Sequence, residues 1–60
     1  MKYQAIAKNG TVLETIENVE VVEHAQGFFF FEGELNTNIR RRDILYAISD
    51  EYLRAVKKVD

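Results

Sequence analysis

Two segments that mix apolar and polar residues around a turn dipeptide, in the first quarter of the chain, predict a β-hairpin. Segments 3–8 and 11–16 flank the dipeptide Asn9-Gly10, which is typical of a type I′ turn, in which both central residues have positive φ. A two-residue turn of this kind sets two apolar pairs opposite each other, Ile6 with Leu13 and Tyr3 with Ile16. The two pairs lie on opposite faces, so both faces of the hairpin carry apolar side chains.

A second hairpin is expected in the middle of the chain. Segment 19–24 has strand character, and Gln26-Gly27 offers a position for positive φ before the segment 28–32, which begins with four phenylalanines. The polar residues that follow, Glu32-Gly33-Glu34, indicate the end of that strand. The two hairpins together predict a small four-stranded antiparallel sheet.

The last third of the chain has apolar residues at helical spacing. They are Leu45, Ile48, Tyr52, Val56 and Val59. Ser49 followed by two acids is a favourable helix start, and Lys57-Lys58 suits a helix C-terminus, so we expect an α-helix over 50–59. Segment 43–48 fits a continuation of this helix or a fifth strand equally well, since Ile44, Tyr46 and Ile48 would share one strand face.

These elements predict one α+β domain over residues 1–60: two antiparallel hairpins in a four-stranded sheet, or five-stranded if 43–48 is a strand, followed by a C-terminal α-helix. The alternative fold is a small five-stranded, barrel-like sheet closed by a short helix. Sixty residues allow a single core, and the absence of cysteine excludes a disulfide scaffold or a cysteine-based zinc module. Small chains without such reinforcement often self-associate.

The net charge of −2 gives no general attraction to nucleic acid or anionic lipid. The longest apolar run, 28–31, is far shorter than a membrane span, and the first residues lack the apolar region of a secretion signal. We therefore expect no membrane association and a cytoplasmic location.

The run Phe28-Phe29-Phe30-Phe31 is the most unusual segment of the sequence. In a strand, Phe28 and Phe30 point to one face of the sheet and Phe29 and Phe31 to the other. One helix covers only one of these faces, so the second is either covered by other parts of the chain or forms an interface. We expect self-association, as a homodimer, through this strand.

Arg40-Arg41-Arg42 is the only cluster of arginines, and Tyr46 follows shortly after it. Arginine and tyrosine are enriched in the energetic centres of protein interfaces. The cluster could instead be paired with glutamates of the sheet, or contact phosphates, with Lys57-Lys58 in support. The sequence singles out Arg40, Arg41, Arg42 and Tyr46 as the candidate partner-binding residues.

No arrangement of residues predicts catalysis or a cofactor. His24 is the sole histidine, the hydroxyl residues lack the sequence of a nucleophile elbow, and the three glycines do not form a phosphate-binding loop. We expect no enzyme activity, cofactor or metal site, but a small binding protein of inhibitor or adaptor type, such as phages and other mobile elements encode. The alternatives are a nucleic-acid-binding or transcription-regulating domain that uses Arg40–Arg42, and a module whose sheet edge adds to a partner's sheet.

Overall fold

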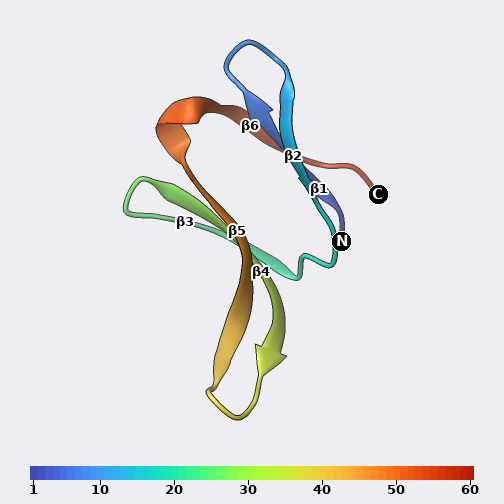
Figure 1. Cartoon of the computed structure of the whole chain (residues 1–60), viewed down its shortest axis with the longest axis vertical. Coiled ribbons are helices and arrows are strands. Elements are labelled where there is room, and N and C mark those ends of the chain that lie inside the picture. Colours follow the sequence, from blue (N-terminus) through green and yellow to red (C-terminus); the bar gives the residue numbers. More distant parts are fainter.

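The chain forms two three-stranded antiparallel sheets and no α-helix (Figure 1). This computed structural model describes all residues 1–60. The strands are β1 (Tyr3–Ala7), β2 (Val12–Ile16), β3 (Val21–Ala25), β4 (Phe28–Asn36), β5 (Arg41–Ser49) and β6 (Leu53–Lys58). The prediction of an α+β domain with a C-terminal helix is therefore wrong, and the fold class is all-β. The two predicted hairpins exist, but each belongs to a different sheet.

The first sheet has the strand order β2-β1-β6, so the two ends of the chain meet in one sheet. Tyr3 lies opposite Ile16 in β2, as expected, but Ile6 lies opposite Val12 and not Leu13. The turn explains this shift. Only Gly10 has positive φ, and Asn9 instead accepts hydrogen bonds at Oδ1 from the backbone and hydroxyl of Thr11, at 3.0 and 2.7 Å. The connection is a three-residue loop followed by a bulge rather than a type I′ turn.

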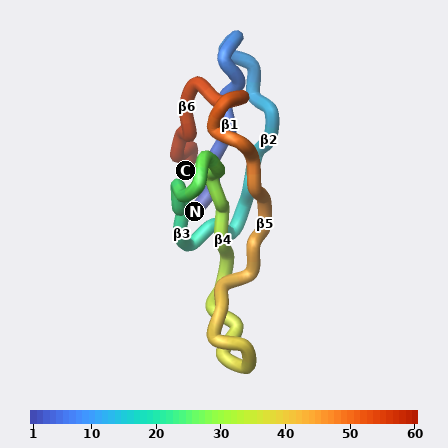
Figure 2. The backbone as a smooth tube through the Cα atoms, turned by 90° about the vertical axis from the view of Figure 1, so that its left-hand side faces the viewer, coloured from blue at the N-terminus to red at the C-terminus, as the bar shows by residue number.

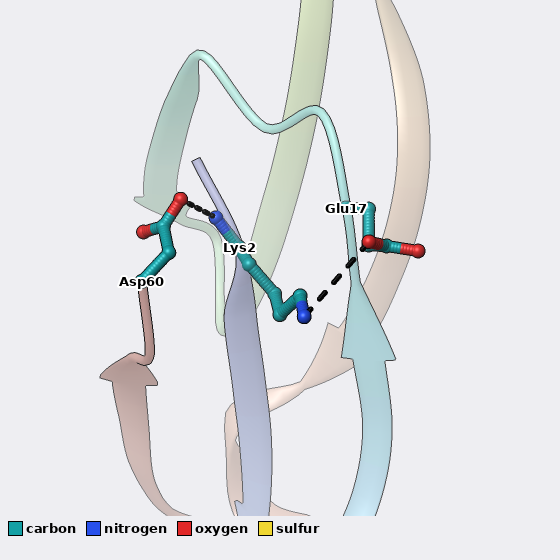
Figure 3. A network of polar contacts seen from close by, with 3 residues as sticks. All are labelled: Lys2, Glu17 and Asp60. Carbon is teal, nitrogen blue, oxygen red and sulfur yellow. Dashed lines mark hydrogen bonds and ion pairs between the residues drawn. The ribbon is translucent and has the colours of Figure 1, made fainter.

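Polar contacts of Lys2 connect the start of the chain to both neighbouring strands (Figure 3). The backbone N–H of Lys2 donates to Asp60 Oδ2 at 3.0 Å, and its ammonium lies 3.9 Å from Glu17 Oε1. The backbone N–H of Val59 also donates to the carbonyl of Lys2 at 2.9 Å. These contacts hold the open ends of β6 and β2 against β1.

The second sheet has the strand order β3-β4-β5. Its first turn, Gln26-Gly27, has positive φ at both residues (54° and 78°), which is the geometry of a type I′ turn. The full register of β3 against β4 is regular, from Val21 opposite Glu32 to Ala25 opposite Phe28. Segment 43–48 lies within β5, so the strand interpretation of that segment is confirmed.

The predicted helix over 50–59 is replaced by a single 3-10 turn, Asp50–Tyr52, and strand β6. Leu53 and Val56 both face the core although they are three residues apart. A bulge opposite Ile6 and Ala7 inserts Arg54 as an extra residue, because Ala7 pairs with Leu53 and Ile6 with Ala55. The bulge changes the apolar spacing of this strand from two to three, which is why the pattern imitated a helix. Ser49 makes no side-chain capping bond.

The core is small and lies where the two sheets meet. Its members are Ala5, Ile16, Val19, Phe31 and Leu53. Beyond this core the distal half of the β4–β5 hairpin extends away from the rest of the molecule (Figures 1 and 2). The molecule measures 40 × 27 × 11 Å along its principal axes, so it is long and thin. We call residues 33–44, the projecting end of this hairpin, the arm.

Candidate functional site

The arm displays three large apolar side chains to solvent. Leu35, Ile39 and Ile44 have exposed fractions of 54%, 60% and 63%, the first on β4, the second in the connecting turn and the third on β5. Asn36 stabilises the turn, because its Oδ1 accepts the backbone N–H of Asn38 at 3.0 Å. Burial of apolar surface drives most protein association, so an exposed group of this kind is typical of a contact surface.

The three arginines occupy different environments along the arm. Arg40 is in the turn with a φ of 55°, and Arg41 opposite Asn36 is also exposed. Arg42 is half-buried, and its Nη1 donates to the carbonyl of Gly33 at 3.0 Å across the base of the arm. None of the three lies within 4.0 Å of a carboxylate, so the alternative considered for them, pairing with glutamates of the sheet, is absent as direct ion pairs. Arg40 and Arg41 are therefore available to a partner, whereas Arg42 supports the hairpin.

Tyr46 does not lie with the exposed arginines. Its ring packs on Phe31 with 5.9 Å between centroids and an angle of 50°, at the edge of the core. The sequence placed Tyr46 beside the arginines because the two are close along the chain. In the structure an extended strand separates them, and Tyr46 contributes to packing rather than to the arm's surface.

Leu45 closes the base of the arm on one side. Phe31 pairs with Tyr46 and Glu32 with Ile44, so Leu45 is the extra residue of a bulge. Its side chain lies against Gly33, where an added Cβ would come within 3.3 Å of both Leu45 δ-carbons. Gly33 therefore lets Leu45 pack directly onto the backbone of β4.

The four phenylalanines divide between the two faces of β4, as the alternation predicts. Phe31 is fully buried and Phe29 packs against the core, whereas Phe28 is 43% exposed on the opposite face and stacks with Phe30 at 6.1 Å. Only Phe28 and Phe30 remain as candidates for self-association. Because β4 is the central strand of its sheet, it offers a partner a face and not a backbone edge.

His24 forms a close pair with the carboxylate of Asp50. Its ring stacks on Phe29, with centroids 4.2 Å apart and an angle of 8°, and its Nε2 lies 2.8 Å from Asp50 Oδ2. The Asp50 backbone N–H also donates to the carbonyl of Gly27, at 2.8 Å. The pair fixes the 3-10 turn to the β3–β4 turn, and no hydroxyl or thiol hydrogen-bonds to the ring as a nucleophile would.

Glu32 at the base of the arm is the one carboxyl with a shifted pKa. Partial burial raises the pKa of Glu32 above its ordinary value of 4.5, as do the hydrogen bond and the negative charge of neighbouring Glu23. The positive charge of Arg42 acts in the opposite direction. Arg42 thus reduces an internal repulsion at the same place where it holds Gly33.

A depression of about 330 Å³ lies beside the base of the arm. Its lining includes Glu20, Glu34 and Asp43 together with Leu45. Three carboxylates make it unsuitable for an anionic ligand. They do not converge as a metal site would, since no group of three potential metal ligands is present.

The sequence therefore identified the charged part of the arm's exposed surface but not its apolar part. Arg40 and Arg41 were singled out because charged clusters stand out in a sequence, but Leu35, Ile39 and Ile44 were not, because isolated apolar residues are indistinguishable from core positions. A usable signal was the turn Thr37-Asn38: apolar residues directly beside a polar turn are often exposed.

Comparison of the chain with models of protein families, with curated proteins and with solved structures gave no match. The structure also contains no helix with the length and apolar character that crossing a bilayer requires.

Proposed function

We propose that this chain is a non-catalytic binding protein of the inhibitor or adaptor type, acting in the cytoplasm, whose arm occupies an acidic surface of another protein. The observation that carries the proposal is the projecting arm itself, where Leu35, Ile39 and Ile44 are exposed beside the unpaired side chains of Arg40 and Arg41. Exposed apolar area with arginine beside it is the composition of an interface centre.

The charge of the arm supports an acidic partner. Its three arginines and two acids give a net charge of +1, in a chain whose net charge is −2. The positive charge is concentrated at the tip, since Arg40 and Arg41 are exposed there, whereas Glu34 and Asp43 line the depression at the base. A partner with carboxylates around a small apolar patch matches this arrangement.

Nucleic acid is the weaker candidate for the same surface. Phosphate binding would use Arg40 and Arg41, but it would leave Leu35, Ile39 and Ile44 without a role, because the backbone of a nucleic acid offers them no apolar surface. The net charge also opposes it. A protein surface accounts for both kinds of exposed residue.

The experiment is capture of partners from a bacterial lysate by tagged protein, with and without nuclease. We expect a stoichiometric protein that survives nuclease and is lost with the double variant Ile39→Ser, Arg40→Ala. Arg42 is left unchanged because it supports the hairpin. The matched control is Val12→Ser with Lys8→Ala, which removes comparable exposed groups from the far end of the molecule. Loss of binding in the control as well, or material that disappears with nuclease, would contradict the proposal.

A further inference from the structure

We infer that β5 pairs along its free backbone edge with β5 of a second copy, in antiparallel orientation, to form a two-fold dimer. This inference goes beyond the proposed function and gives the self-association expected from the sequence a surface other than the β4 face. The observation behind it is that the open edge of β5 has a positive cluster, Arg40 and Arg41, at one end and the exposed acid Glu51 just beyond the other.

The edge of β5 is the longest one that the fold leaves open. The four edge strands are β2, β6, β3 and β5, and only β5 has nine residues. It pairs with β4 on one side and with no strand on the other, and the part labelled β5 runs along one side of the molecule in Figure 2. An unpaired row of N–H and C=O groups is a template for another strand.

Apart from the bulge at Leu45, this edge lacks the features that usually discourage pairing. Natural edge strands carry lysine, proline or central charges. β6 has Lys57-Lys58, whereas the middle of β5, Ile44–Ile48, is five consecutive uncharged residues without proline. Ile44 and Leu45 are exposed there, so pairing would also bury apolar area.

The charges select an antiparallel copy of the same strand. If Tyr46 lies on the two-fold axis, Arg41 of one copy approaches the 3-10 turn of the other copy, where Glu51 is exposed. Asp50 of that turn is already held by His24, and Arg42 by Gly33, so neither adds to the interface. The contact between Arg41 and Glu51 occurs twice by symmetry. A parallel arrangement would instead place the arginines of both copies together. The strand is thus complementary to itself in one direction only, which favours a second copy over an unrelated strand.

The size of the molecule agrees with this inference. The chain exposes 4393 Å², against about 4,000 Å² for a monomer of 7.0 kDa. Only six of its 60 residues are buried. A chain with so few buried residues leaves enough apolar surface exposed to form an interface between two copies.

The test is a charge exchange between Arg41 and Glu51, both exposed and without ion pairs in the monomer. Arg41→Glu alone sets two acids against each other at both symmetric contacts, and Glu51→Arg alone sets two arginines against each other. We expect each single variant to dimerise about tenfold or more weakly than wild type, by sedimentation equilibrium at low salt. An equimolar mixture of the two should dimerise like wild type, because both contacts are then opposite in charge.

Recovery in the mixture separates the interface from folding, since the same chains are present in both samples. A wild type that stays at its monomer mass, or single variants that dimerise as well as wild type, would overturn the inference. Phe28→Ser distinguishes the two self-association surfaces: loss of the dimer there, with no effect of the charge exchange, would also overturn the edge inference and leave the β4 face. Binding of the acidic partner is measured separately, with the double variant Ile39→Ser, Arg40→Ala. The proposed function and the β5 dimer can therefore be contradicted independently of each other.

Discussion

Single residues in left-handed conformation determine where this chain turns. Asn18, Gln26 and Arg40 all have positive φ although each has a Cβ, with values of 62°, 54° and 55°. This region is unfavourable for side chains other than those of glycine, asparagine and aspartate. Asn18 suits its position, whereas Gln26 and Arg40 do not. The strain at Arg40 lies at the tip of the arm, where an exposed arginine is what the proposed surface needs.

We predict that Gln26→Asn stabilises the fold. Asparagine followed by Gly27 is the preferred pair for the type I′ geometry found here, so the free energy of unfolding should rise by roughly 0.5–1 kcal/mol. Urea denaturation measures the change. The contrasting variant is Asn9→Gln, which loses both hydrogen bonds from Thr11 and should lower stability by about 1 kcal/mol. A midpoint for Gln26→Asn at or below wild type would contradict the prediction.

Glu32 gives the fold a pH dependence of unusual sign. Its raised pKa means that the folded chain binds this proton more tightly than the unfolded chain. The contribution of Glu32 to stability is therefore full at low pH and is lost as pH rises from about 4.5 through the raised pKa.

Glu32→Gln should remove the loss of stability that accompanies ionisation of Glu32. We expect the variant to be more stable than wild type at neutral pH, and the difference between the two to shrink as pH falls below 4.5, in urea denaturation followed across that range. Glu23→Gln serves as the control, because it removes the neighbour that raises the pKa and should give a smaller change of the same sign. A difference that grows on acidification would show that Glu32 is held in its ionised form instead.

At the scale of the strand, bulges account for most of what the sequence could and could not predict. The existence of both hairpins and the pairing of Tyr3 with Ile16 followed from the turn dipeptides and the strand-like segments on either side of them. The helix did not, because Leu53 and Val56 reach the same core across a bulge at Arg54. A bulge depends on the partner strand, and β6 pairs with β1, some fifty residues away. No local pattern contains that information.

The candidate site shows the same limit. Arg40 and Arg41 could be identified from charge, but the separation of Tyr46 from them depends on whether 43–48 is extended. The exposure of Leu35 and Ile44 depends on the arm projecting past the core, which is a property of the sheet and not of either residue.

The arm provides a prediction at this scale. Arg42→Ala removes the hydrogen bond to the Gly33 carbonyl and the charge beside Glu32, so stability should fall by about 0.5–1.5 kcal/mol and the arm amides should exchange faster. Arg41→Ala is the matched control, one residue away and exposed, and should change stability by less than about 0.5 kcal/mol. Equal effects of the two variants would mean that Arg42 does not brace the hairpin.

The whole molecule depends on very little buried material. At about 0.05–0.15 kcal/mol per residue, sixty residues have a total stability of roughly 3–9 kcal/mol. The radius of gyration is 11.7 Å, against about 10 Å for a compact chain of this length. Such a shape places few side chains beyond the reach of water.

The stability of the fold should therefore depend strongly on Phe31. It is the largest fully buried side chain, and Phe31→Ala should cost about 3–5 kcal/mol, enough to unfold most of the population, in thermal or urea denaturation. Phe28→Ala, on the same strand but 43% exposed, should lose far less and remain folded. Comparable losses in both variants would show that the outer face of β4 is buried in solution, as self-association through that face requires.

The pairing of β1 with β6 also has a consequence for how the chain folds in time. The strands β3, β4 and β5 follow one another through short turns, so their sheet forms by closing small loops. The register of Tyr3 with Lys58 instead closes a loop over almost the entire chain, and the entropy of that closure must be lost before the contact stabilises anything. Mutations in β6 should then change the stability of the fold but not its folding rate, which corresponds to kinetic φ-values near zero. Substitutions that stabilise β6 should slow unfolding without accelerating folding. β6 would then be the last strand to join, by pairing with β1 after the β1–β2 hairpin has formed.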